Sequence, residues 1–142
     1  MRALFDVNVL IALFDPAHVH HERAHAWWKR NKAAGWASCP LTENGFVRIL
    51  SQPKYPNAIP VNEAIQRLSR AIGGGGHAFW ADDVSLTDEN VFHREHMLGP
   101  KQITDLYLLA LAIRNTGRLV TFDGGIPLSA VEGARETDRV IL

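Results

Sequence analysis

Cysteine is scarce in this sequence, charge of one sign is not in surplus, and long hydrophobic runs are missing. The single cysteine, Cys39, excludes an intramolecular disulfide and argues against a structural zinc knuckle. Lysine plus arginine and aspartate plus glutamate each number 15, so any attraction to nucleic acid must come from a local patch of charge. No apolar run approaches the roughly 20 residues that cross a bilayer. Asp6 also comes too early in the chain for a signal peptide, so we expect a cytoplasmic protein with no membrane segment.

Short apolar runs alternate with longer amphipathic stretches along the chain, which is typical of an α/β fold. The apolar runs predict strands at Ala3–Phe5, Trp36–Cys39, Ala78–Ala81, Leu119–Phe122 and Arg139–Leu142. The amphipathic stretches predict helices at Val9–Phe14, His18–Ala33, Pro40–Leu50, Pro60–Ile72, Asp88–His96 and Asp105–Arg114, the last two with Thr87 and Thr104 as N-caps. We therefore expect residues 1–142 to form one domain, a three-layer α/β/α sandwich around a mostly parallel sheet of four to five strands.

Four acidic residues stand where the predicted strands and helices meet. Asp6 follows the first strand and Asp123 follows the fourth, while Glu43 lies in the first turn after the second strand. Because the carboxyl ends of parallel strands lie at one edge of a sheet, we expect these three side chains to converge there. Asp105 opens the long apolar helix and joins them if that helix begins at the same edge.

Several carboxylates that lie close together raise one another's pKa, and a divalent cation relieves the repulsion. Oxygen ligands favour Mg²⁺ or Mn²⁺, and such a site can activate water and neutralise charge on a phosphate. The pattern therefore predicts a metal site suited to phosphodiester cleavage. The alternative interpretation is that Glu43 and Asp105 are only favourable charges in the first turn of a helix.

Four segments in this order resemble the motif blocks of the PIN-domain family, and most closely its VapC-type toxins. The segments are Phe5–Leu10, Thr42–Arg48, Thr104–Ala112 and Leu119–Asp123, and together they span nearly the whole chain. The resemblance implies a Mg²⁺- or Mn²⁺-dependent endoribonuclease that cleaves structured RNA such as tRNA or rRNA loops. It also implies a homodimer that a cognate antitoxin holds inactive.

The resemblance also implies roles for single residues. Asp6, Glu43, Asp105 and Asp123 match the family's acidic metal ligands. Asn8 and Thr121 match polar residues that orient those ligands, a role that matters because hydrogen bonds to a ligand fix its geometry.

Basic residues and histidines near these positions allow more than one interpretation. Arg48, Lys101 and Arg114 are candidate contacts for RNA phosphates, although an ordinary charged surface fits them as well. His18, His20, His21 and His25 lie together at one predicted helix start. His21 and His25 stand one helical turn apart, a spacing that can bind zinc, but no third ligand is placed to complete such a site. A solvated helix face is the interpretation that we prefer.

Two other functions remain open at this point. The same acids would serve a DNA-directed metal-dependent nuclease, and the chain could also be a non-catalytic RNA-binding or scaffold module. A haloacid-dehalogenase-type phosphatase is disfavoured, because that family needs a second aspartate where this chain has Asn8.

Overall fold

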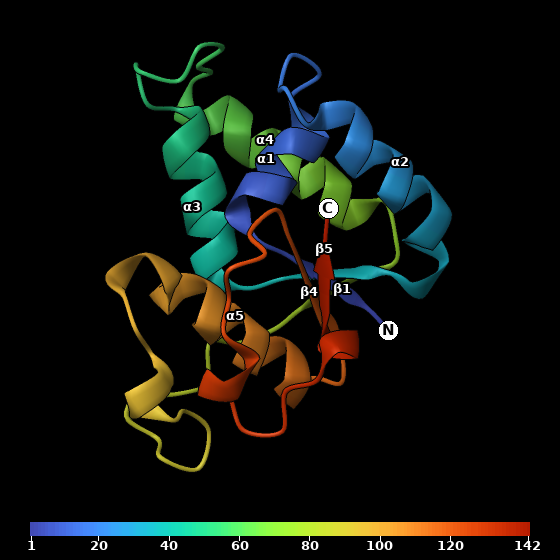
Figure 1. The fold of residues 1–142 in the computed structure, drawn as a ribbon. Coiled ribbons are helices and arrows are strands. Elements are labelled where there is room, and N and C mark those ends of the chain that lie inside the picture. The colour runs from blue at the N-terminus through green and yellow to red at the C-terminus, as the bar shows by residue number, and fades with distance from the viewer.

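The computed structural model describes all 142 residues, and its centre is a sheet of five parallel strands (Figure 1). The strands are β1 (Ala3–Phe5), β2 (Trp36–Ser38), β3 (His77–Phe79), β4 (Arg118–Thr121) and β5 (Arg139–Ile141). Their order across the sheet is β3-β2-β1-β4-β5, so β1 lies in the middle. All four pairings are parallel, and the carboxyl ends of the strands therefore lie at one edge.

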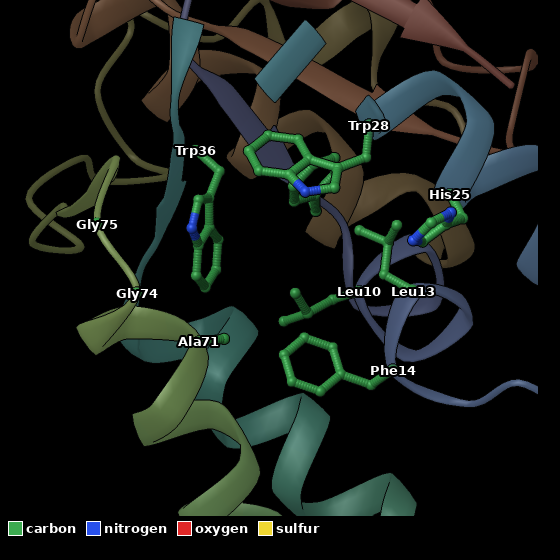
Figure 2. Close-up of a pocket in the computed structure, with 10 residues that line it drawn as sticks. Leu10, Leu13, Phe14, His25, Trp28, Trp36, Ala71, Gly74 and Gly75 are labelled. Atoms are coloured by element: carbon green, nitrogen blue, oxygen red, sulfur yellow. The ribbon is translucent and has the colours of Figure 1, made fainter. Parts of the chain in front are cut away.

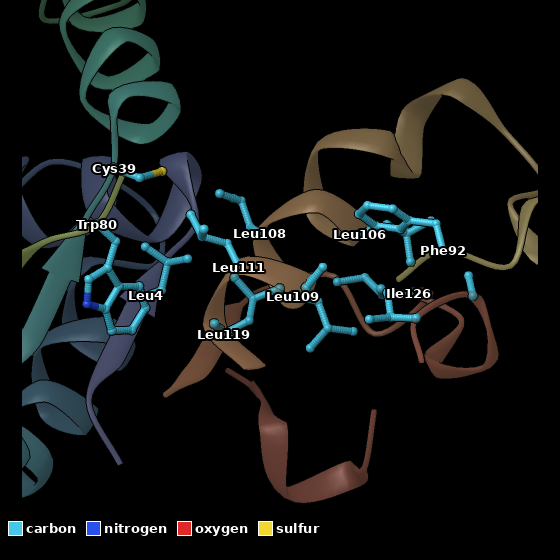
Figure 3. Close-up of a cluster of buried hydrophobic side chains, with 14 of the residues drawn as sticks. Leu4, Cys39, Trp80, Phe92, Leu106, Leu108, Leu109, Leu111, Leu119 and Ile126 are labelled. Atoms are coloured by element: carbon cyan, nitrogen blue, oxygen red, sulfur yellow. The ribbon is translucent and has the colours of Figure 1, made fainter. Parts of the chain in front are cut away.

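Five α-helices cover the two faces of this sheet, as the three-layer prediction requires. They are α1 (Val7–Phe14), α2 (His21–Asn31), α3 (Pro40–Leu50), α4 (Val61–Gly73) and α5 (Ile103–Arg114). The leucines of α5 pack on one face against Leu4 and Leu119 of the sheet, with Trp80 and Cys39 beside them (Figure 3). Helices α1 to α4 share a second buried cluster with the other face, which includes Phe5, Trp36 and Val120. None of the helices has the length and apolar character that a bilayer crossing needs.

The helix predicted at Asp88–His96 is wrong. This stretch consists of turns and a single 3₁₀ turn at Arg94–His96. Asp88 accepts a hydrogen bond from the N–H of Asn90, and Phe92 is buried and forms an isolated bridge with Val131. Long-range packing of Phe92 therefore decides the conformation, whereas Thr87 and the acids after it indicated a helix only through local sequence.

Several element boundaries differ from the prediction in ways that affect the acidic edge. Helix α5 begins at Ile103 after Gln102 as its N-cap, so Thr104 lies inside the helix. Strand β4 ends at Thr121, and Phe122 and Asp123 stand beyond it. Helix α2 begins only at His21, which leaves His18 and His20 in the loop before it.

Candidate active site

Asp6 is built into the start of α1 at the carboxyl end of the central strand. Its side chain caps the helix, because Oδ1 accepts a hydrogen bond of 2.8 Å from the N–H of Val9. The other carboxylate oxygen accepts a hydrogen bond from the hydroxyl of Thr121. Burial raises the pKa of Asp6 above its ordinary value, although these hydrogen bonds act in the opposite direction and the nearby charge of Asp123 adds to the rise.

Thr121 connects the first acid to the last one. Its buried hydroxyl donates to Asp6 and accepts a hydrogen bond of 3.0 Å from the N–H of Asp123. The exposed carboxylate of Asp123 then accepts the N–H of Gly125 at 2.7 Å, which forms a tight turn after the strand. Gln102, the N-cap of α5, donates to the carbonyl of Gly125 at 2.7 Å and so ties this turn to the start of α5.

Asp105 lies in the first turn of α5, close enough to Asp6 and Asp123 for their charges to affect its pKa. Burial, and to a smaller extent the charges of Asp6 and Asp123, raise the pKa of Asp105 to about 6. No hydrogen bond to its carboxylate offsets this rise. Helix α5 therefore begins at the same edge of the sheet as Asp6 and Asp123, as the predicted convergence of the acids requires.

Glu43 stands apart from these three aspartates. Its Oε1 accepts a hydrogen bond of 2.6 Å from the hydroxyl of Ser38, and the Nε2 of His77 lies 2.8 Å from the same hydroxyl. The serine hydroxyl has one proton, which it donates to the Glu43 carboxylate. The hydroxyl oxygen is therefore the acceptor for His77, which donates through Nε2–H. Burial lowers the pKa of His77, which keeps the ring neutral near pH 7.

The direction of Glu43 follows from the alternation of side chains along β2. Trp36 points into the cluster under α1 to α4, whereas Ala37 points into the cluster under α5. Ser38 therefore faces the same side as Trp36, and Glu43 turns toward it. The charges that act on Asp6 and Asp105 come from the other aspartates and not from Glu43.

The four acids that the sequence groups together therefore do not form one compact cluster, because Glu43 lies apart from the three aspartates. No group of three or more His, Cys, Asp or Glu side chains in the structure lies close enough together to hold a metal ion. The structure instead brings Asp6, Asp105 and Asp123 into mutual electrostatic range, with Glu43 held at the same edge by Ser38.

The other predicted site residues fall in different places around this edge. Asn8 is exposed in the first turn of α1, and its side chain makes no hydrogen bond within the chain. Arg48 lines an open groove of about 610 Å³ between α3 and α4, together with Glu43. Lys101 is exposed in the turn directly before α5. Arg114 lies at the far end of α5, where it forms an ion pair of 3.0 Å with Asp83.

The histidines around the start of α2 do not form a zinc site, because they belong to no group that could hold a metal. His21 instead bonds the carbonyl of Ala12 through Nδ1 at 2.7 Å and stacks on His25. His18 and His20 lie against Phe122, the residue before Asp123. The prediction of a plain solvated helix face is therefore wrong for these two residues, which precede the helix and pack onto the end of β4.

Sequence reasoning missed three side chains that position the acids: Ser38, His77 and Gln102. Ser38 lies in the predicted strand Trp36–Cys39, five residues before Glu43, so a hydroxyl at that position was the available signal. His77 and Gln102 gave no such signal, because each reaches a partner that is distant in sequence.

A separate hollow of about 500 Å³ lies between α1, α2 and α4, away from the acids (Figure 2). Trp28, Trp36 and Phe14 point into it from three different elements. None of the four predicted acids lines this hollow, so its apolar walls do not form part of the acidic edge.

Comparison with known proteins agrees with the resemblance found in the sequence. Residues 3–132 match the family model of the PIN domain. The chain is 55% identical over 134 residues to Ribonuclease VapC44 of Mycobacterium tuberculosis, with 94% of each chain covered. It is also 49% identical over 125 residues to Ribonuclease VapC38 of that organism, with 87% of this chain and 86% of the relative covered. Ribonuclease VapC39 of the same organism is 43% identical over 137 residues, which cover 96% of this chain and 99% of the relative. The chain therefore belongs to the PIN-domain family and, within it, to the VapC type.

Proposed function

We propose that this protein is a divalent-metal-dependent endoribonuclease, the toxin of a toxin–antitoxin pair. The observation that carries the proposal is the set of Asp6, Asp105 and Asp123, which come from three different elements and share one electrostatic environment. Relatives that cover most of the chain are named ribonucleases, which favours RNA over DNA as the substrate.

The chemistry of the three aspartates fits a hard divalent cation. Every donor is a carboxylate oxygen, and hard cations such as Mg²⁺ and Mn²⁺ prefer oxygen ligands. Burial first, and then the charges of Asp6 and Asp123, raise the pKa of Asp105, and no hydrogen bond from the protein lowers it, which supports a cation at this place. Asp6, Asp105 and Asp123 would hold the ion if their carboxylates moved closer together around it, and the bound ion would supply an activated water and neutralise charge on a phosphate oxygen.

The protein's own side chains would orient these groups. Thr121 and the N–H of Val9 fix both oxygens of Asp6, and each oxygen keeps a further lone pair for a ligand. Ser38 fixes the carboxylate of Glu43, which we propose orients the attacking water or completes the metal's ligands. Asn8 is free to bind a water or the substrate beside Asp6. In this mechanism water rather than the 2′-hydroxyl attacks the phosphorus, so no 2′,3′-cyclic phosphate forms. We propose that the bond to the 3′-oxygen breaks, as in similar enzymes, so that the products carry a 3′-hydroxyl and a 5′-phosphate.

We propose the partners that the family membership suggests. These are a cognate VapB-type antitoxin, a second copy of the chain in a homodimer, and structured RNA such as tRNA or rRNA loops in the cytoplasm. The support is the match to VapC-type relatives over most of their length. Sedimentation of the purified protein with and without antitoxin would test the first two partners.

The activity is tested by incubating total cellular RNA with antitoxin-free protein in Mg²⁺, in Mn²⁺ and in EDTA. Wild type is compared with Asp105→Asn and with the control Asp83→Asn, whose carboxylate lies at the other end of α5. We expect discrete fragments from wild type and the control only when metal is present. Sequencing and end analysis of these fragments would identify the target and the chemistry.

The other outcomes are equally specific. Fragments in EDTA that end in 2′,3′-cyclic phosphate would contradict the metal-dependent mechanism. Cleavage of single-stranded DNA but not RNA would establish a DNA-directed nuclease. Folded wild type that binds RNA but cuts nothing would establish a non-catalytic RNA-binding module.

A further inference from the structure

A cluster of cationic and aromatic side chains lies at the end of β4, beside the acidic edge. We call His18, His20, Arg23 and Phe122 the Arg23 cluster. The His20 ring centroid lies 4.8 Å from that of Phe122, and the His18 ring lies nearly parallel to Phe122 at 6.4 Å. The guanidinium carbon of Arg23 lies 5.1 Å from the centre of the Phe122 ring. The mechanism proposed above uses none of these side chains.

The hydrogen bonds inside the Arg23 cluster use the acceptor nitrogens of both histidines and leave only donors without a partner. A guanidinium can only donate, so the contact of 3.1 Å between Arg23 and the Nδ1 of His20 makes Nδ1 the acceptor and leaves Nε2–H free. The Nδ1 of His18 likewise accepts the N–H of His20 at 3.0 Å, which leaves its Nε2 as the remaining donor. A group of unpaired donors with no unpaired acceptor is suited to an anion.

The charge of Arg23 is not neutralised by the protein. Five other arginines form ion pairs with carboxylates, whereas Arg23 is exposed and forms none. Asp15, the carboxylate whose charge acts on His18, is already engaged by the hydroxyl of Tyr55 and the N–H of Ala17. Stacking on Phe122 instead holds the guanidinium in place, so its remaining N–H groups are available to a ligand.

Phe122 connects this cation to the end of β4, where the chain continues to Asp123. Phe122 stands between Thr121, which bonds Asp6, and Asp123, and consecutive Cα atoms are about 3.8 Å apart. Phe122 belongs with the cluster under α1 to α4, so Arg23 approaches the acidic edge from that side. An exposed arginine that stacks on the residue between Thr121 and Asp123 is a cation that a polyanion would meet as it reaches the site.

We propose that the Arg23 cluster binds a phosphate of the RNA strand next to the one that is cleaved. Arg23 donates to the phosphate oxygens, His20 adds its Nε2–H, and Phe122 holds Arg23 in position. This inference rests on the proposed ribonuclease function and names a substrate contact for the same site. It also assigns RNA contact to Arg23, which the sequence did not indicate, while Arg114 is occupied by Asp83.

The test is the salt dependence of RNA binding in EDTA, where the proposed cleavage cannot occur. The probe is a short fluorescent oligouridine, and its Kd is measured by anisotropy over a series of NaCl concentrations. We compare wild type with Arg23→Ala, Arg23→Lys and Phe122→Leu. The matched control is Arg70→Ala, an exposed arginine on the last turn of α4, which leads to the opposite edge of the sheet.

A lost phosphate contact gives a defined signature. We expect Arg23→Ala to weaken binding about tenfold at low salt, as for a charge-assisted hydrogen bond. The slope of log K against log salt should fall by about 0.7, the value for one phosphate contact on a single strand. Arg23→Lys should keep the slope, Phe122→Leu should weaken binding less than Arg23→Ala, and Arg70→Ala should change neither quantity.

The outcomes separate this inference from the proposed function. An unchanged slope in Arg23→Ala, whatever its Kd, would overturn the phosphate contact, and so would equal losses in Arg23→Ala and Arg70→Ala. Absence of metal-dependent cleavage by wild type, together with the expected slopes, would overturn the nuclease but leave the Arg23 cluster as an RNA contact. Denaturant unfolding of each variant checks that the slopes compare folded proteins.

Discussion

Replacing Asp105 by asparagine should stabilise the metal-free protein, even though Asp105 is proposed to be essential for activity. The Asp105 carboxylate is half-buried beside Asp6 and Asp123 and accepts no hydrogen bond from the protein. Its negative charge therefore opposes folding when no cation is bound. Asparagine has nearly the same shape and removes that charge, so folding should become more favourable.

The size of the effect follows from the pKa of Asp105, which is raised from 3.8 to about 6. At about 1.4 kcal/mol per unit, a rise of about two units corresponds to at most about 3 kcal/mol of destabilisation above pH 6. Because the side chain is only half-buried, solvent screening reduces this to roughly 1 to 2 kcal/mol. We therefore expect Asp105→Asn to raise the free energy of unfolding by roughly 1 to 2 kcal/mol near neutral pH in EDTA.

The dependence on pH has a definite sign. A carboxyl group whose pKa is higher in the folded state binds its proton more tightly there, so protonation favours folding. Wild type should gain this stability as the pH falls through about 6 toward 3.8. Asp105→Asn should lack that contribution, so the difference between the two proteins should shrink over the same range.

The assay is urea unfolding followed by tryptophan fluorescence, with four tryptophans as reporters, over a pH series in EDTA and in Mg²⁺. Mg²⁺ should stabilise wild type more than Asp105→Asn, because a ligand of the folded state stabilises it by mass action. The reasoning is refuted if Asp105→Asn is less stable than wild type near neutral pH in EDTA. It is also refuted if the difference between the two proteins does not change between about pH 4 and 6.

Three further predictions concern the residues that position the site and the strands. Ser38→Ala should reduce the cleavage rate or the apparent Mg²⁺ affinity about 10- to 100-fold, because Glu43 loses the hydrogen bond that fixes it; rates measured over a metal series check this. Gly35→Ala should destabilise the protein by more than about 1 kcal/mol in thermal unfolding, because φ is +79° and an added Cβ would lie 2.6 Å from the carbonyl oxygen of Gly76. Thr116→Gly should raise stability by about 1 kcal/mol in the same assay, because φ is 56° at a β-branched residue, and a lower melting temperature would contradict this.

The positions of Asp6 and Asp123 could be predicted because the topology of the sheet alone determines them. A parallel sheet places every residue that follows a strand at one edge, which fixes Asp6 and Asp123 without knowledge of side-chain packing. Asp105 required one more fact, the direction of α5, which the sequence left open. That direction follows from the connection to β4, since a helix that precedes a parallel strand and packs on the sheet runs opposite to it.

The orientation of Glu43 could not be predicted, because it depends on partners in other strands. Ser38 lies only five residues away, but its direction follows from which face of β2 it occupies. His77 lies 39 residues from Ser38 and reaches it only because β3 pairs with β2. The false helix at Asp88–His96 has the same origin, since local capping signals were overridden by the burial of Phe92.

Asp6 combines a structural role with its proposed catalytic one, and this determines how the site must be tested. Its carboxylate caps α1 and accepts the Thr121 hydroxyl, so Asp6→Ala should cost about 1 kcal/mol for the lost cap alone. Loss of activity in Asp6→Ala would therefore not separate a missing metal ligand from a displaced helix. The carboxylate of Asp105 accepts no hydrogen bond, and its replacement by asparagine is expected to stabilise the fold. A variant that is more stable and yet inactive can only have lost the chemistry, so Asp105→Asn is the sharper test of the acidic site.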